Sequence, residues 1–169
     1  MDGYYNDAEQ TRETFTEDGF LRTGDRAAFD NEGYVKIIGR TKEQFKTSKG
    51  KYVVPSPIEM KVGSSSDIEM SCVTGSSLHQ PIVIGTLTET GRGKDKIKMA
   101  EEIARHIHAI NATLDNHEKI EKVVIVDENW TVENNMLTPT LKLKRREVED
   151  KYSTQYLDWY QKKDFVFTV

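Results

Sequence analysis

The chain has 169 residues, of which 36% are hydrophobic and 31% charged, with a mean hydropathy of −0.66. This composition predicts a globular protein with a modest core, enough for one domain or for a domain with an additional segment. A formal net charge of −4 argues against a nucleic-acid-binding surface, and a single cysteine excludes an internal disulfide. No signal peptide, membrane span or zinc-ligand spacing is found in the sequence, so we expect a cytoplasmic protein.

A short helix and two hairpins are predicted in the first third of the chain. The helix is expected at residues 8–15, and the turn "DNEG" between "RAAF" and "YVKII" predicts a hairpin over residues 26–39. A second hairpin is expected around Gly50, and Pro55 ends its second strand. Residues 1–39 contain too few apolar side chains for a core, so this segment is expected to be the end of something larger.

A helix start is predicted directly after the second hairpin. Ser56 is expected as the N-cap, Pro57 as the first helical residue, and Glu59 as the acidic residue that completes a capping box. The helix is expected to be short and to end near the polar stretch "VGSSSD".

The core is predicted in the middle of the chain. The runs "EMSCVTGSS" and "QPIVIGTLTE" are expected to form adjacent buried strands, and "KVVIV" to form a third. Before the third strand, Asp95 is expected to cap an amphipathic helix that extends to Asn111. The apolar residues of this helix recur at helical spacing: Ile97, Ala100, Ile103, Ala104, Ile107 and Ile110.

A last amphipathic helix is predicted from Val148 to about Tyr160, supported by Glu147 and Lys151 one turn apart. Together these elements predict an α+β domain in which helices cover a small sheet.

Two residues near the first hairpin have side chains suited to a nucleotide. Asp25 follows Gly24 at a strand end, and its two carboxylate oxygens can accept both hydroxyl protons of a ribose. Arg40 offers a planar group that matches phosphate or ribose oxygens. On spacing alone, an aspartate that caps its own turn and a surface arginine are the simpler interpretations.

Lys142 lies in "TPTLKLKRRE", between a proline-containing loop and the last helix, where a mobile cation can enter and leave a site. The simpler interpretation of this lysine, and of Lys144, Arg145 and Arg146, is a solvated helix face. Cys72 falls in an apolar strand without an adjacent base, which indicates core packing.

The combination of motifs is more specific than any one of them. "GYYND…DGFLRTGDRAAFDNEGYVKIIGRTKEQFKTSKGKYVVPSPIE" resembles the region that joins the large and small domains of the adenylate-forming acyl-CoA synthetases. About a hundred residues later, "LTPTLKLKRRE" resembles their carboxy-terminal lysine motif, in the form typical of long-chain fatty-acid–CoA ligases. The resemblance implies that residues 1–41 end the large AMP-binding domain and contain the hinge. Residues 42–169 would then form the C-terminal lid domain, with a short, mainly antiparallel sheet.

The resemblance also implies roles in the adenylation step. Asp25 matches the aspartate that binds the ribose hydroxyls of ATP, Arg40 the arginine beside the same nucleotide, and Lys42 the hinge residue. Lys142 matches the lysine that contacts the carboxylate and the nucleotide phosphate, although this chain has Leu141 where many relatives have glycine. ATP is expected with Mg²⁺, bound mainly by the large domain.

In the second half-reaction, coenzyme A attacks the acyl-adenylate. The resemblance assigns this step to a different face of the lid, the hairpin with Lys46 and Gly50, which is presented when the lid rotates. No metal site is assigned to the chain. The implied partners are the protein's own large domain, a carboxylic acid, ATP and coenzyme A, with peripheral membrane association through the acyl substrate and without nucleic acid.

Two other functions stay open beside the ligase. An adenylation domain that loads a carrier protein predicts a phosphopantetheine-bearing partner, whereas a detached lid predicts a non-catalytic binding module. For the ligase, the chain is expected to be a piece of a longer enzyme or the product of a split gene, and to be inactive by itself. Acyl specificity would be set by the large domain.

Overall fold

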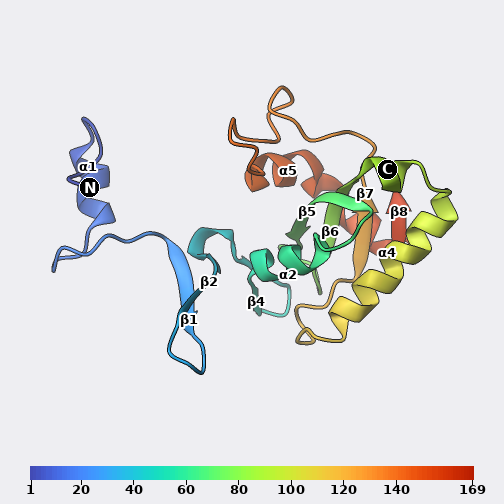
Figure 1. Cartoon of the computed structure of the whole chain (residues 1–169), viewed down its shortest axis with the longest axis horizontal. Helices are drawn as coiled ribbons and strands as arrows, with labels where there is room; N and C mark the ends of the chain where they lie inside the picture. Colours follow the sequence, from blue (N-terminus) through green and yellow to red (C-terminus); the bar gives the residue numbers. More distant parts are fainter. The chain divides into compact units, whose positions relative to one another are not determined.

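The structure is a computed structural model that describes all 169 residues and divides into two compact units, Met1–Glu43 and Gln44–Val169 (Figure 1). The first unit contains a helix, a hairpin and a 3₁₀ turn: α1 (Ala8–Thr14), β1 (Asp25–Phe29), β2 (Val35–Arg40) and η1 (Thr41–Glu43). Asp7 caps α1 by accepting a hydrogen bond from the backbone N–H of Gln10 at 2.8 Å. The predicted short helix and first hairpin are both confirmed.

One face of the β1–β2 hairpin is apolar and uncovered. The antiparallel register pairs Ala27 with Ile37 and Phe29 with Val35, and residues two apart on a strand share a face. Phe29, Val35 and Ile37 are all exposed, and α1 contains no buried residue. The first unit therefore has no hydrophobic core, as its sequence predicted.

The second unit is a four-stranded sheet with helices on both faces, preceded by a small hairpin. Its strands are β3 (Phe45–Lys46), β4 (Tyr52–Val53), β5 (Ile68–Thr74), β6 (Ile82–Leu87), β7 (Lys122–Ile125) and β8 (Val166–Thr168). Its helices are α2 (Pro55–Val62), α3 (Glu89–Arg92), α4 (Lys96–Asn111), α5 (Arg145–Tyr152), the 3₁₀ turn η2 (Ser153–Gln155) and α6 (Tyr156–Gln161). The α+β class is confirmed, and none of the helices has the length and apolar composition needed to cross a lipid bilayer.

The sheet is mixed, which corrects the prediction of a mainly antiparallel one. Its strand order is β5-β6-β7-β8, and only β5 and β6 are antiparallel, whereas β6–β7 and β7–β8 are parallel. Parallel neighbours require a long crossover connection. The segment with α4 provides the first crossover and the segment with α5 and α6 provides the second. The sequence interpretation missed β8 because this strand has only three residues.

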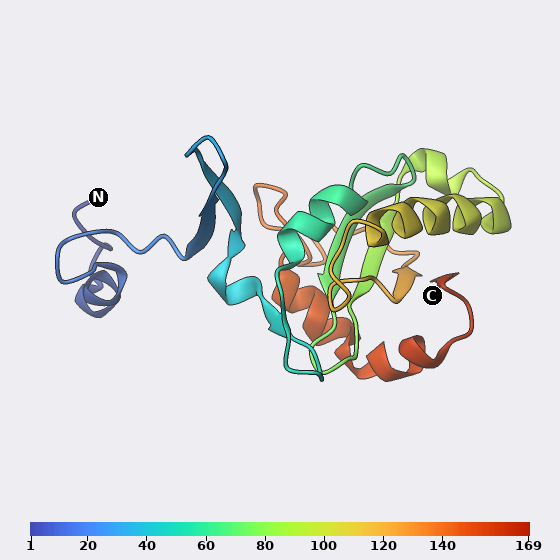
Figure 2. The ribbon, with the colours of Figure 1, turned by 90° about the horizontal axis from the view of Figure 1, so that it is seen from below.

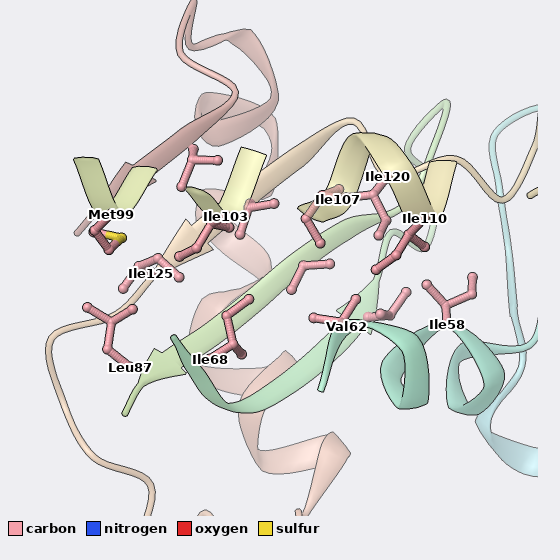
Figure 3. Close-up of a cluster of buried hydrophobic side chains, with 14 of the residues drawn as sticks. Ile58, Val62, Ile68, Leu87, Met99, Ile103, Ile107, Ile110, Ile120 and Ile125 are labelled. Carbon is pink, nitrogen blue, oxygen red and sulfur yellow. The ribbon is translucent and has the colours of Figure 1, made fainter. Parts of the chain in front are cut away.

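Two separate hydrophobic clusters cover the two faces of the sheet. Figure 2 shows the helices that lie on these faces. Helices α2 and α4 pack on one face and α5 and α6 on the other, and adjacent strand residues such as Val83 and Ile84 belong to opposite clusters. Burial on both faces explains why β6 and β7 are continuous apolar runs in the sequence. Figure 3 shows the first cluster, in which Ile58, Ile103 and Ile107 lie among the buried side chains.

Helix α4 follows the prediction except at its first turn. The carboxylate of Asp95 caps it, accepting from the N–H groups of Ile97 and Lys98 at 3.0 and 3.2 Å. Ile97, however, is 71% exposed, and Met99 takes the corresponding core position. Ile97 precedes the buried Ile103 by six residues, which places it about a third of a turn away from the core-facing side of the helix.

The predicted capping box of α2 is wrong. The helix begins at Pro55, and Val54, in an extended conformation, is the N-cap without a side-chain hydrogen bond. Val54 precedes Pro55 and is extended, as is usual before proline, whereas Ser56 is helical although it precedes Pro57, so the helix starts one residue ahead of the predicted N-cap. Glu59 instead accepts a hydrogen bond from the backbone N–H of Val73 at 2.7 Å.

The last predicted helix is interrupted. A 3₁₀ turn separates α5 from α6, which leaves Leu157 exposed and buries Trp159. The predicted Glu147–Lys151 support is also wrong, because Lys151 donates to Glu128 in the loop after β7, at 2.6 Å from Oε2. The hydroxyl of Tyr152 also donates to Glu128, so this carboxylate is already fixed when Lys151 pairs with it.

Candidate functional site

In the first unit, the hairpin brings the two predicted nucleotide ligands together. Asp25 begins β1, Arg40 ends β2, and the two residues are direct cross-strand partners. Arg40 Nε lies 3.1 Å from Asp25 Oδ1, and the side chains are 60% and 28% exposed. This contact uses one guanidinium nitrogen and one carboxylate oxygen, so the remaining polar atoms can contact a ligand.

The backbone on both sides of Asp25 is shaped by irregular geometry. Gly24 has a φ of 76°, which is strained for residues with a side chain. On the other side, the β1–β2 register shifts between Arg26 and Ala27. Such bulges change the direction of neighbouring side chains and are frequent next to ligand sites. The Asp25–Arg40 pair is thus held at a bent end of the hairpin rather than in a regular ladder.

Lys42, the predicted hinge, is exposed in η1, one residue before the end of the first unit. The second unit begins at Gln44 and contains the other predicted site residues.

Lys46 and Gly50 lie on the β3–β4 hairpin at the start of the second unit, and the predicted second hairpin is confirmed. Both residues are exposed, and Gly50 adopts a φ of 77° at the turn. Lys46 Nζ lies 5.7 Å from the ring centroid of Tyr52, its cross-strand neighbour. A cation–π contact at an exposed site is weak, so it does not prevent the ammonium from reaching an anion.

Lys142 lies in a tight loop held by backbone hydrogen bonds. Thr138 N–H donates to Lys142 O at 2.8 Å, and Lys142 N–H donates to Thr138 Oγ1 at 3.0 Å. Below the loop, Leu137 and Leu143 form a β-bridge and contribute to the second cluster. The side chain of Lys142 is exposed. The loop therefore fixes the backbone of Lys142 and leaves its ammonium in solvent.

Leu141 adopts a left-handed conformation with a φ of 60°. This conformation is available to glycine without strain, and it costs a branched side chain about 1–2 kcal/mol. The hydrogen bond from Leu141 N–H to Thr138 O, at 2.8 Å, closes the turn that requires it. The structure thus gives a physical reason for a preference for glycine immediately before the lysine.

The Lys142 loop and the β3–β4 hairpin lie at separate places on the second unit (Figures 1 and 2). Four surface hollows of about 330 to 860 Å³ are lined by residues other than the six predicted site residues. No group of three or more His, Cys, Asp or Glu side chains is placed to hold a metal ion. The six predicted site residues therefore lie outside these four hollows.

Arg145 is a polar residue that the sequence interpretation placed wrongly. Its side chain is only 14% exposed and contacts Glu59 Oε1 at 2.5 Å, the carbonyl of Val73 at 2.7 Å and Cys72 Sγ at 3.3 Å. The prediction that Cys72 packs in the core is confirmed, since this residue is fully buried. Glu59 and Arg145 are 86 residues apart, so no local pattern identifies the pair.

The family of the AMP-binding enzyme C-terminal domain matches residues 42–164. The chain belongs to this family. The resemblance to adenylate-forming enzymes is thereby confirmed, and similar proteins match this chain over a still larger share of its length.

Relatives of this chain are named as fatty acyl-CoA synthetases and long-chain-fatty-acid–CoA ligases. Fatty acyl-CoA synthetase B of Dictyostelium discoideum is 32% identical over 180 residues, 96% of this chain and 27% of the relative. Long-chain-fatty-acid–CoA ligase 5 of Mus musculus is 32% identical over 94% of the chain and 26% of its own length. The chain thus spans about a quarter of the length of these relatives.

Solved adenylation domains of carboxylic acid reductases share the fold. The adenylation domain of carboxylic acid reductase from Segniliparus rugosus, in complex with AMP and a co-purified carboxylic acid, is 26% identical with a TM-score of 0.79. The corresponding domain from Mycobacterium chelonae is 26% identical with a TM-score of 0.81. Each match covers 95% of this chain and 26% of the other.

Proposed function

We propose that this chain is the C-terminal lid domain, with its joining segment, of an ATP-dependent acyl-CoA synthetase that adenylates a long-chain fatty acid and transfers the acyl group to coenzyme A. The observation that carries the proposal is the likeness, over nearly the whole chain, to relatives named fatty acyl-CoA ligases. The longer protein would perform the reaction, because the chain spans only a quarter of those relatives.

In the proposed mechanism, Asp25 and Arg40 bind the nucleotide. Asp25 accepts hydrogen bonds from the two ribose hydroxyls, and Arg40 orients the carboxylate while offering its terminal amino groups to the nucleotide. The 3.1 Å contact between them supports a preformed pair, which needs little reorganisation when ATP arrives. Mg²⁺ accompanies ATP as part of the substrate, and none of its ligands is assigned to this chain.

Lys142 supplies positive charge during adenylation. The fatty-acid carboxylate attacks the α-phosphorus of ATP, the new bond forms an acyl-adenylate, and pyrophosphate leaves with the electron pair of the broken P–O bond. An ammonium near the attacking carboxylate and the α-phosphate stabilises the negative charge that develops on these oxygens. The exposed side chain on a tightly bonded loop supports this role, because the charge can approach the nucleotide without deforming its own backbone.

Thiolysis uses another face of the same lid. The thiol of coenzyme A loses its proton and attacks the acyl carbonyl, the acyl C–O bond to the phosphate breaks, and AMP leaves with that electron pair. The proposed contacts to coenzyme A come from the β3–β4 hairpin with Lys46 and Gly50, and rotation about Lys42 exchanges this face for that of Lys142. Two observations support this exchange of faces. The Lys142 loop and the β3–β4 hairpin lie at separate places on the second unit, and the boundary between the two units lies next to Lys42.

A second candidate is an adenylation domain that passes the acyl group to a carrier protein. It is favoured by the likeness to the adenylation–carrier didomain of carboxylic acid reductase from Segniliparus rugosus, 26% identical with a TM-score of 0.78. The acceptor thiol distinguishes the two functions. A ligase releases acyl-CoA when free coenzyme A is added, whereas a carrier-loading domain acylates only a phosphopantetheine-bearing protein.

The deciding experiment is Lys142→Ala in the longer protein that contains this chain. Carboxylate-dependent pyrophosphate exchange is expected to fall by about two orders of magnitude, while thiolysis of supplied acyl-adenylate stays within a few fold. Lys119→Ala, which removes another lysine outside the proposed site, is the control. Equal loss in both half-reactions would contradict the assignment of Lys142 to the first step.

A further inference from the structure

Arg145 connects the loop of Lys142 to the rest of the second unit. It is the first residue of α5 and follows Lys142 by only three residues, a span of at most about 10 Å. Its mostly buried guanidinium is hydrogen-bonded to α2 through Glu59 and to β5 through the carbonyl of Val73. The end of the Lys142 loop is therefore attached to two elements from the other half of the unit.

The contacts of Arg145 form a closed ring rather than a single ion pair. Glu59 Oε1 accepts from Arg145 Nη2 at 2.5 Å and from the backbone N–H of Val73 at 2.7 Å. The carbonyl of Val73 in turn accepts from Arg145 Nη1 at 2.7 Å. Because the Arg145 and Glu59 side chains are only 14% and 19% exposed, loss of any one of these groups leaves a largely buried polar group without its partner. Such a ring specifies one orientation of the first turn of α5.

The Lys142 loop needs this kind of support. Leu141 is held at a φ of 60°, a strained conformation that persists only where the surrounding structure enforces it. At its base the loop is held by the Leu137–Leu143 bridge and by the hydrogen bond from Lys144 N–H to Met136 O at 2.8 Å. The Arg145 ring adds a charged attachment directly after the loop, on a different part of the unit.

We propose that Arg145, held by Glu59 and Val73, is a positioning residue that keeps the Lys142 loop in the conformation in which the lysine acts. This inference rests on the proposed role of Lys142 in adenylation. Arg145 does not touch the substrate, since its guanidinium is committed to protein groups. Its effect on the reaction is transmitted through the backbone of residues 138–145, and misplacement of a catalytic group by about 1 Å can cost a hundredfold in rate.

The test variant combines Arg145→Met with Glu59→Gln. Removal of both charges avoids an unpaired buried ion, and the glutamine oxygen can still accept from Val73 N–H, so the unit is expected to fold. The matched control is Arg146→Met, which removes the adjacent arginine, 91% exposed and 3.6 Å from Asp150. A thermal unfolding curve for each variant checks that the fold is kept.

In the 169-residue chain, amide hydrogen exchange measures the loop directly. Exchange of Leu141 N–H, which donates to Thr138 O, is expected to accelerate at least tenfold in the double variant and to stay unchanged in the control. Unchanged hydrogen exchange in the double variant would contradict the proposal that Arg145 holds the Lys142 loop, whatever the result for activity.

In the longer protein, kinetics test the link to Lys142. The double variant is expected to lower kcat for carboxylate-dependent pyrophosphate exchange about tenfold, with the KM for ATP and the rate of thiolysis within twofold of wild type. Added to Lys142→Ala, it is expected to cause no further loss, because it acts through that lysine. The positioning role would be overturned if the losses caused by the double variant and by Lys142→Ala multiplied when combined, or if the double variant slowed both half-reactions equally. If Lys142→Ala alone leaves pyrophosphate exchange unchanged, the proposed function fails, and with it the effect of Arg145 on the reaction. The support of the Lys142 loop by Arg145 is then judged from hydrogen exchange alone.

Discussion

The two units of the chain differ in what holds them together. Gln44–Val169 buries two clusters of side chains on the two faces of one sheet, whereas Met1–Glu43 buries none of its large apolar side chains. The hairpin of the first unit nevertheless presents Phe29, Val35 and Ile37 on one face, as a strand pair does when it packs on another layer. A hairpin can therefore be specified by its turn and register and still depend on another surface for stability.

The strongest test of this comparison is to separate the units. Residues 44–169 are expected to unfold cooperatively in urea, with a free energy of unfolding within about 1 kcal/mol of the whole chain, because the core lies entirely in this unit. Residues 1–43 are expected to show no cooperative transition. Circular dichroism follows both, and a cooperative transition in the short segment would show that it has a core of its own.

The next largest effect is expected inside α4. Ile103→Ala removes a fully buried side chain from the first cluster and is expected to destabilise the chain by about 3 kcal/mol. Ile97→Ala, the same change on the same helix at an exposed position, is expected to stay within about 0.5 kcal/mol. Urea unfolding measures both, and similar losses would mean that Ile97 is buried in the folded protein.

Ile37→Ala tests the apolar face of the hairpin in the first unit, where Ile37 is 65% exposed. In the 169-residue chain, the free energy of unfolding is expected to change by less than about 0.5 kcal/mol. In the longer protein, where we propose that the apolar face of the hairpin is covered, the loss is expected to be about 1–2 kcal/mol or more. The two contexts serve as each other's control, and equal effects would contradict a covering layer.

The smallest effect concerns pH. The ammonium of Lys94 holds the pKa of Glu102 below its ordinary value of 4.5, and Asp67 and Glu102 raise the pKa of Lys94 above 10.5. Because the folded pKa of Glu102 is depressed, its stabilisation is present above about pH 4.5 and is lost as pH falls through the folded pKa. Because the folded pKa of Lys94 is raised, its stabilisation is present below pH 10.5 and is lost at higher pH.

Glu102→Gln is therefore expected to lower the thermal midpoint slightly at pH 7 in low salt, and the difference from wild type is expected to disappear towards pH 3. Glu101→Gln, the exposed neighbour on α4, is the control and is expected to leave this pH dependence unchanged. A difference that persists undiminished at pH 3 would mean that the ion pair is not its cause.

Local patterns predicted the elements more reliably than their partners. Turn residues indicated both hairpins, and Asp95 with the apolar repeat indicated α4, because caps and periodicity depend on residues a few positions apart. The same reasoning failed at Glu59, whose spacing from Ser56 matches a capping box but whose carboxylate bonds Val73 and Arg145. A partner 86 residues away leaves no trace in a local window.

The candidate site shows the same division. The motif resemblance selected Asp25 and Arg40, and the strand register then placed them 3.1 Å apart. Lys142 was selected in the same way, whereas the support of its loop by Arg145 was missed, because a basic run is interpreted as solvated unless its burial is known.

Composition, short-range patterns and motifs were enough to predict the family, most of the helices and strands in their order, and the unit that could form a core, but not β8 or the break between α5 and α6. The parallel pairing of β6, β7 and β8, the exposure of Ile97 and the burial of Arg145 became apparent only in the folded structure. The physical reason is that pairing and burial are set by contacts between segments distant in the chain, whose free energy depends on which surfaces exclude water together.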